Sequence, residues 1–205
     1  MKRYLPIILF LIGLLFFGGV IAFVKSRGST SQTTEEESVA ELPMSQRPFT
    51  SLSPTKIAAN GNYGHWLTLN IKNINVPGAK TVEYLLEYTI EDGRTQGVPG
   101  QVELKGQDIQ RDLLLGSESS GKFTYDKGVE KGKLTLKFRD SKGKLIGKLL
   151  TDFHLQTNTT EITSVDGSYK VTLPKIIKGV YFVTMKTFGG DENYHIFASD
   201  GKTYE

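Results

Sequence analysis

The sequence predicts an all-β protein, an antiparallel β-sandwich that follows an N-terminal transmembrane helix and a flexible linker. Three observations lead to this prediction. Residues 5–24 contain no charged side chain, apolar and polar residues alternate from residue 63 onward, and turn residues separate the alternating runs. Residues 63–156 show no sustained helical period, so strands account for the alternation better than helices do.

The uncharged run extends from Leu5 to Val24. As a helix it would be about 30 Å long, which matches the hydrocarbon core of a bilayer. We therefore predict residues 1–25 to be a single-pass anchor that contacts lipid through residues 5–24. A cleaved signal peptide is the main alternative, although its apolar segment would be only about 7–15 residues long.

The charges around this run give a weak indication of its orientation. Lys2 and Arg3 precede it, and Lys25 and Arg27 follow it, so the positive charge is nearly balanced across the span. The span is at the extreme N-terminus and a polar segment follows it. Together these features favour a cytoplasmic N-terminus and an extracytoplasmic C-terminal domain.

Residues 26–60 are predicted to be a flexible polar linker. The segment is rich in Ser, Thr, Glu and Gln, and it contains three consecutive glutamates at positions 35–37 as well as Pro43, Pro48 and Pro54. Such a composition buries too little apolar surface to offset the entropy lost on ordering.

Residues 61–157 are predicted to form the β-sandwich. Seven strands are expected, near residues 66–74, 82–91, 102–104, 109–115, 122–125, 134–139 and 144–155. The segment 116–121 is expected to be a loop. Seven short strands separated by turns are typical of a sandwich with an Ig-like or fibronectin-III-like appearance. The cysteine pair of Ig domains is missing, because the chain contains no cysteine.

Residues 158–205 are predicted to form a β-meander that either docks on the sandwich or completes it. This segment is too short for an independent core without a disulfide or a metal. Within it, Tyr181, Val183 and Met185 share one face of a strand. We expect this face to point into the core and the opposite face, which carries Thr184, to be more accessible, with Val180 and Phe182 partly covered by neighbours.

Composition excludes several classes of function. The absence of cysteine excludes disulfides, thiolate metal sites and cysteine catalysis. The formal net charge of +3 is too small for a nucleic-acid footprint. The three histidines, His65, His154 and His195, lack metal-ligand spacing. We therefore predict no enzymatic activity and assign no catalytic residue, metal ligand or cofactor.

Carboxylates and lysines form two sets that need a structural test. Glutamates recur on one strand face at positions 83, 87 and 91, where a solvated face is expected and a glycosidase pair stays open. Lysines accompany glycines on turns expected to be adjacent, at Lys127, Lys131, Lys133, Lys142 and Lys144. These lysines either increase solubility or contact anionic lipids or a wall polymer.

Aromatic side chains are the third set. Five of them could form a carbohydrate-binding platform, although most aromatics on alternating strands belong to the core. The five are Tyr63, Trp66, Tyr181, Tyr194 and Tyr204.

The layout of span, linker and β-sandwich resembles that of uncharacterised small bacterial envelope proteins. The resemblance covers the whole chain as architecture only, and no functional residue is transferred by it. The leading hypothesis is a binding or interaction module of the cell envelope, with a protein, a glycan or a wall polymer as partner. The alternatives are an envelope hydrolase using surface carboxylates such as Glu87 or Asp191, and a structural subunit of a membrane complex. The subunit would pack its helix through Gly13, Gly18 and Gly19.

Overall fold

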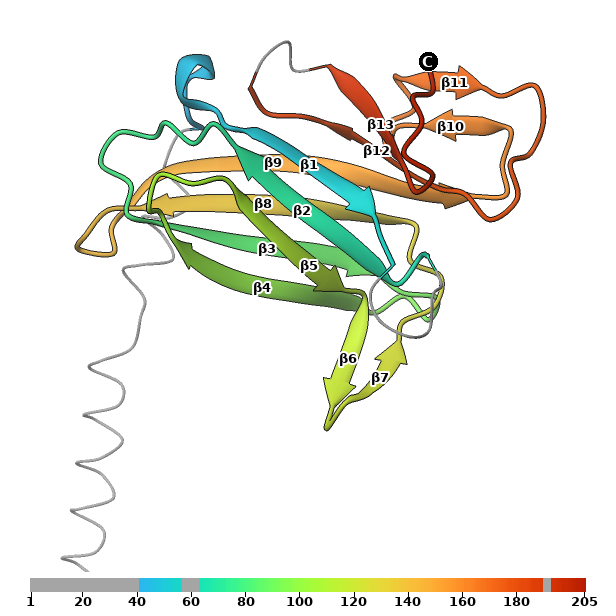
Figure 1. Cartoon of the computed structure of the whole chain (residues 1–205), viewed down its shortest axis with the longest axis horizontal. Helices are drawn as coiled ribbons and strands as arrows, with labels where there is room; N and C mark the ends of the chain where they lie inside the picture. The colour runs from blue at the N-terminus through green and yellow to red at the C-terminus, as the bar shows by residue number, and fades with distance from the viewer. Residues whose placement is uncertain (1–40, 57–62, 190–192) are drawn as a thin grey trace, which may run out of the picture. The chain divides into compact units, whose positions relative to one another are not determined.

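The structure, a computed structural model, describes residues 41–56, 63–189 and 193–205 (Figure 1). These residues form β-strands and one short 3-10 helix, η1 (Met44–Gln46). The strands are β1 (Phe49–Pro54), β2 (Trp66–Lys72), β3 (Thr81–Thr89), β4 (Thr95–Glu103), β5 (Ile109–Leu114), β6 (Gly116–Ser119), β7 (Lys122–Tyr125), β8 (Lys131–Arg139), β9 (Leu145–Thr157), β10 (Glu161–Thr163), β11 (Lys170–Thr172), β12 (Tyr181–Lys186) and β13 (Tyr194–Ala198).

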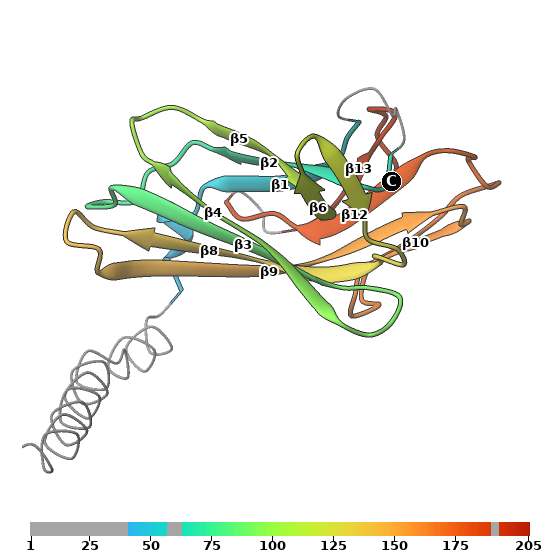
Figure 2. The ribbon, with the colours of Figure 1, turned by 90° about the horizontal axis from the view of Figure 1, so that it is seen from below.

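Two antiparallel sheets pack face to face, as Figure 2 shows. The small sheet has the order β1-β2-β5, and the large sheet has the order β13-β12-β9-β8-β3-β4. The core between them includes wholly buried side chains from both sheets, among them Leu52, Leu69, Leu86, Leu136 and Phe153. The predicted all-β, antiparallel, sandwich-like fold is confirmed.

The alternation of apolar and charged side chains along β3 shows which face of the large sheet packs on the core. Val82 and Leu86 are wholly buried, whereas Glu83 and Glu87 lie on the outer face. The strand register places these glutamates opposite Lys137 and Lys133 of β8, respectively. Opposite charges on facing residues stabilise a pairing modestly, by about 0.2–1 kcal/mol each.

The predicted linker is wrong in its C-terminal part. Its residues 49–54 form β1, and Leu52 of that strand is wholly buried. Just before β1, Leu42 packs against Gly147, where a Cβ would lie 2.2 Å from a Leu42 methyl carbon. This strand was not expected, because serine, threonine and proline are typical of loops. Every second side chain of the strand is nevertheless buried. Residues 26–40 and 57–60 lie outside the described residues.

Two further strands differ from expectation. Residues 116–119, expected to be a loop, form β6, which pairs with β7. The third predicted strand is longer than expected, since β4 begins at Thr95 and includes Gly97, Pro99 and Gly100. Glycine and proline are usual turn residues, but here they lie on an edge strand, where proline is tolerated.

The C-terminal segment both completes the sandwich and docks on it, which are the two outcomes that the sequence left open. β12 pairs with β9, and β13 pairs with β12, so these strands complete the large sheet. The β10–β11 hairpin is separate, and it packs over a second apolar cluster formed by Ile162, Val171, Leu173, Val180 and Phe182. The described residues together form one compact unit.

The expected accessibility of Thr184 is wrong. Tyr181, Val183 and Met185 do face the main core, but Phe182 is wholly buried in the second cluster and Thr184 is only 1% exposed. The β10–β11 hairpin and the second apolar cluster pack on the face of β12 that carries Phe182 and Thr184. Both faces of the strand are therefore covered.

No helix in the described ranges is long and apolar enough to cross a membrane. The predicted anchor, residues 1–25 with its span from Leu5 to Val24, lies outside those ranges.

An isosteric pair of substitutions on β12 tests this packing. The Thr184 hydroxyl has no hydrogen-bond partner among the described residues, so Thr184→Val should leave the free energy of unfolding unchanged or raise it. Val183→Thr places a hydroxyl in the apolar core and should lower that free energy by about 1–3 kcal/mol. Urea unfolding followed by circular dichroism measures both, and a larger loss at position 184 would contradict the assignment of the two faces.

Candidate functional site

The β6–β7 hairpin projects away from the sandwich between β5 and β8 (Figure 1). The chain leaves β5 through Gly116, which has a φ of 151°. A Cβ at this position would lie 2.2 Å from the carbonyl oxygen of Thr124, so only glycine permits the close approach. The sequence therefore needs glycine here to direct the hairpin out of the sandwich.

The Tyr88 hydroxyl fastens the base of this hairpin. Tyr88 is 2% exposed, and its hydroxyl donates to Asp126 Oδ2 at 2.8 Å, just after β7. Burial, together with the neighbouring Asp126 carboxylate, raises the pKa of Tyr88 well above its ordinary value of 10.0. The hydroxyl therefore stays protonated and bonded across the neutral pH range.

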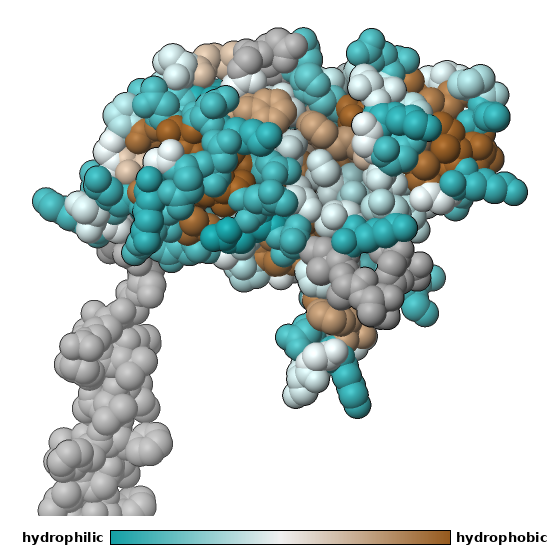
Figure 3. All heavy atoms as spheres, viewed as in Figure 1, coloured by the Kyte–Doolittle hydropathy of each residue, from teal (hydrophilic) through white to brown (hydrophobic). Residues whose placement is uncertain are grey.

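Four rings at the base of the hairpin form what we call the aromatic cluster: His65, Trp66, Phe123 and Tyr125. The His65 and Tyr125 rings stack with centroids 4.2 Å apart, and Trp66 meets Phe123 edge to face at 5.7 Å. All four side chains are half-buried, so part of each ring is accessible. Figure 3 shows apolar surface on this hairpin between hydrophilic side chains.

A cleft of about 470 Å³ adjoins the aromatic cluster, and we call it the loop-end cleft. Its lining comes from the start of β2, the β7–β8 connection, the end of β9 and the start of β12. The lining residues are Gly64, His65, Asp126, Lys127, Gly128, Val129, Glu130, His154, Leu155, Gln156, Thr157, Thr159 and Tyr181. The volume lies within the range of small-molecule sites, about 300–1,000 Å³.

The loop-end cleft brings together two of the three histidines. His65 precedes β2 of the small sheet and His154 is near the end of β9 of the large sheet, and both line the cleft at the same end of the sandwich. His195 lies on β13 and does not line the cleft. Within the described ranges, no three His, Cys, Asp or Glu side chains are grouped so as to hold a metal ion.

Both cleft histidines are in surroundings that favour the neutral ring. Burial lowers the pKa of His65, whose Nδ1 is buried without a partner among the described residues. Burial also lowers the pKa of His154, although the hydrogen bond from its Nδ1 to the Thr163 carbonyl opposes this effect. That hydrogen bond, 2.8 Å long, fixes the orientation of the His154 ring.

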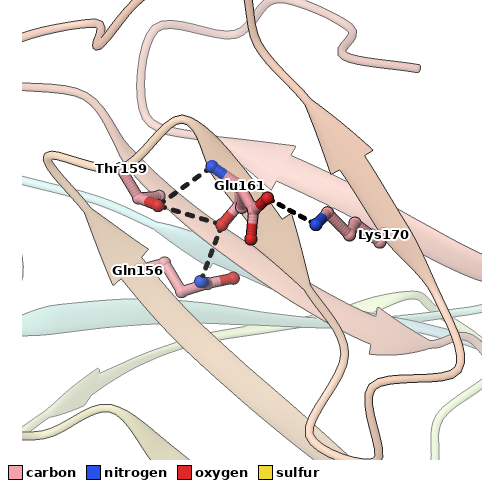
Figure 4. A network of polar contacts seen from close by, with 4 residues as sticks. All are labelled: Gln156, Thr159, Glu161 and Lys170. Carbon is pink, nitrogen blue, oxygen red and sulfur yellow. Dashed lines mark hydrogen bonds and ion pairs between the residues drawn. The ribbon is translucent and has the colours of Figure 1, made fainter.

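A polar network at the edge of the cleft holds the β10–β11 hairpin (Figure 4). The carbonyl oxygen of Glu161 accepts from Gln156 Nε2 at 3.1 Å and from the Thr159 hydroxyl at 3.0 Å. The Glu161 carboxylate also pairs with Lys170 on β11. Gln156 and Thr159 therefore bind their own chain, although both line the cleft.

A second hollow, of about 450 Å³, is polar, and charged side chains in its lining contact neighbouring residues of the lining. Arg47 pairs with Glu41 at 3.1 Å, and the Lys186 ammonium lies 5.0 Å from the centre of the Tyr194 ring. Neighbouring serine hydroxyls hold the pKa of Asp166 well below its usual range. We interpret this hollow as a seam that joins the N-terminal segment, the large sheet and the β10–β11 turn.

The carboxylates considered for catalysis do not line the loop-end cleft. Glu83 accepts from Arg139 Nε at 2.8 Å on the outer face of the large sheet. Glu87 faces Lys133 on the same face, and Glu91 belongs to the turn after β3. Asp191 lies outside the described residues.

The predicted aromatic platform does not form. Trp66 joins the aromatic cluster and Tyr181 lines the cleft, but Tyr194 stacks on Tyr169 and Tyr204 packs on Phe182. Tyr63 lies beneath the Lys56 ammonium. The prediction missed Phe123 and Tyr125, because a short strand next to a serine-rich loop gave no sign that its rings would meet Trp66.

The predicted basic cluster is also wrong as a single patch. Lys127 and Lys131 are near the start of β8, whereas Lys142 and Lys144 follow its end. β8 has 9 residues, so the two groups are about 30 Å apart. Lys133 lies between them on the outer face, opposite Glu87.

Comparison with known protein families finds no matching family, and no curated protein matches the chain. The site is therefore interpreted from its own geometry.

Replacing Tyr88 by phenylalanine tests the fastening of the hairpin. At pH 7, Tyr88→Phe should lower the free energy of unfolding by about 1–3 kcal/mol, because the Asp126 carboxylate loses a buried donor. The pKa of Tyr88 is above 10.0 in the folded protein, so Tyr88 ionises first in the unfolded chain as the pH rises. The stabilising contribution of the Tyr88 hydroxyl is therefore lost above pH 10.0.

The difference between wild type and variant should therefore shrink between pH 9 and about pH 11. Urea unfolding at several pH values measures it. A difference that stays constant or grows would show that the Tyr88 hydroxyl does not have this role.

Proposed function

We propose that the protein is a single-pass membrane protein whose extracytoplasmic β-sandwich is a binding module of the cell envelope. We further propose that recognition occurs at one end of the sandwich, through the aromatic cluster and the loop-end cleft. The observation that supports this proposal is their continuity, because His65 belongs to both. Accessible rings beside a polar cleft, held on a rigid base, are suited to binding.

The strand order supports the finer proposal of a fibronectin-III-like sandwich. β1-β2-β5 corresponds to strands A-B-E of such folds, and β4-β3-β8-β9 corresponds to C′-C-F-G. In this correspondence the β6–β7 hairpin is an insertion between E and F, and β12 and β13 extend the sheet beyond G. The insertion between E and F lies at the end of the sandwich opposite the B–C and F–G loops, so the site proposed here is at the other end from the binding loops of antibody domains.

The membrane part of the proposal depends on the run from Leu5 to Val24. Because η1 and β1 belong to the folded unit, the tether between the span and that unit is shorter than predicted and comprises residues 25–40. A flexible chain of this length has a root-mean-square reach of about 20 Å. The chain enters the described unit at Glu41, which bridges to Lys148 near the start of β9, whereas the loop-end cleft lies at the other end of that strand.

The two other hypotheses have less support. A hydrolase using Glu87 is not favoured, since Glu87 faces Lys133 outside the cleft. The alternative of a structural subunit depends on Gly13, Gly18 and Gly19, which lie outside the described residues.

Two arginines in the apolar run test the anchor. The double variant Leu14→Arg and Leu15→Arg should leave the membrane fraction, because each charge at the centre of a span costs about 2.5–3.5 kcal/mol on the insertion scale. Carbonate extraction of membranes from expressing cells measures this. A double variant that stays in the membrane pellet would rule out the single-span anchor.

A photo-crosslinking residue at position 123 tests the recognition surface. Placed in the aromatic cluster of the full-length protein in its own membranes, it should capture a discrete partner. The matched control is position 142, which lies on the β8–β9 turn at the opposite end of β8. Identical adducts at both positions, or none at position 123, would contradict recognition at the loop end.

A further inference from the structure

The hydrogen bonds of His154 determine which of its ring nitrogens carries the proton. Its Nδ1 lies 2.8 Å from the carbonyl oxygen of Thr163, and a carbonyl oxygen can only accept. Nδ1 must therefore carry the proton and donate. In a neutral imidazole the other nitrogen then has a free lone pair, so His154 Nε2 is an acceptor.

The surroundings of His65 favour the opposite tautomer. Its Nδ1 is buried and has no partner among the described residues. We place the proton of His65 on the other nitrogen, because an N–H at the buried Nδ1 would have no acceptor, as is already the case for the neighbouring Trp66 Nε1. His65 Nε2 is then an N–H donor, and the stacking on Tyr125 keeps the ring in place.

Both Nε2 atoms are available to a ligand. Neither has a hydrogen-bond partner in the described part of the chain, and neither belongs to the buried atoms without partners. Both rings line the loop-end cleft. The cleft therefore offers one donor and one acceptor on two neutral, pre-oriented rings.

The cleft lining carries charges of both signs, one lysine and two carboxylates. Lys127 lines it together with Glu130, and the Asp126 carboxylate already accepts from Tyr88. An anion would meet Glu130 and a cation would meet Lys127, so the lining favours a neutral ligand with many hydrogen-bonding groups. Tyr125 stacks on the His65 ring, and Tyr181 also lines the cleft.

We infer that the loop-end cleft binds a neutral saccharide, whose hydroxyls accept from His65 Nε2 and donate to His154 Nε2. A sugar hydroxyl donates and accepts at once, so it satisfies both rings without a charge. The inference depends on the proposed binding function and specifies its ligand class. The same chemistry occurs in wall glycans and in glycolipid headgroups.

The first test measures the tautomers directly. Full-length protein labelled with ¹⁵N-histidine, in phospholipid nanodiscs without sugar detergents, is examined by long-range ¹H–¹⁵N spectroscopy at pH 7.5. We expect the Nε2–H tautomer for His65 and the Nδ1–H tautomer for His154, with His195 as an internal reference. The same tautomer on both cleft rings would overturn the donor–acceptor pair.

The second test measures binding. N-acetylchitotetraose and cellotetraose are titrated into these nanodiscs, and a parallel sample contains diglucosyl diacylglycerol. We expect the His65 and His154 signals to shift at concentrations up to about 10 mM, a range that detects even weak sites. Response to the soluble sugars indicates a wall glycan, and response only to the glycolipid indicates a headgroup. No shift with any of the three overturns the inference.

Variants separate this inference from a structural role of the rings. His65→Phe keeps the stacking on Tyr125 but removes the donor, and it should weaken saccharide binding at least tenfold. His154→Phe should do the same, whereas His195→Phe, outside the cleft, should bind like wild type. Thermal melts show whether each variant is folded, and a folded His65→Phe protein that binds normally contradicts the inference.

The outcome also distinguishes this inference from the proposed function. A partner captured at position 123 by a chain that binds none of these saccharides would overturn the ligand class alone. Saccharide shifts that survive His65→Phe and disappear with His195→Phe would place the sugar elsewhere on the sandwich and overturn the inference in the same way.

Discussion

The pairing of β9 with two neighbours is the constraint on which the rest of the structure depends. Along one edge β9 pairs with β8, and along the other with β12, so one strand joins the sandwich to its C-terminal extension. Its inner face contributes Leu149, Phe153 and Leu155 to the main core. Because side chains alternate, the other face is left to carry His154 and Gln156, which line the cleft. The end of β9 thus contributes both to the core and to the candidate site, and Leu155 belongs to both.

The polar contact that holds the site is partly buried, whereas the ion pairs on the surface of the molecule are exposed. The Tyr88–Asp126 hydrogen bond lies beneath the projecting hairpin, where burial makes it costly to break. Exposed pairs such as Lys170–Glu161 contribute less, because water screens them. A rigid base under accessible rings reduces the entropy lost on binding, which is what a recognition surface requires.

Much of the fold could be predicted because burial leaves a periodic trace in the sequence. Val82, Leu86, Leu134 and Leu136 alternate with charged or polar residues, and their strands were found. β1 was missed because serine, threonine and proline dominate it, although Leu52 is wholly buried. The outer face of β12 was misjudged since a single strand carries no information about a hairpin that packs on it.

The sequence by itself determined the strand-forming character of residues 63–156, the absence of cysteine chemistry and the uncharged run at the N-terminus. These follow from composition and local periodicity, which need no partner. Only the tertiary structure decided that His65 and His154 share a cleft and that Phe123 meets Trp66. Residues far apart in the chain meet through strand register and sheet packing, and these are set by the core as a whole rather than by the residues of any one segment.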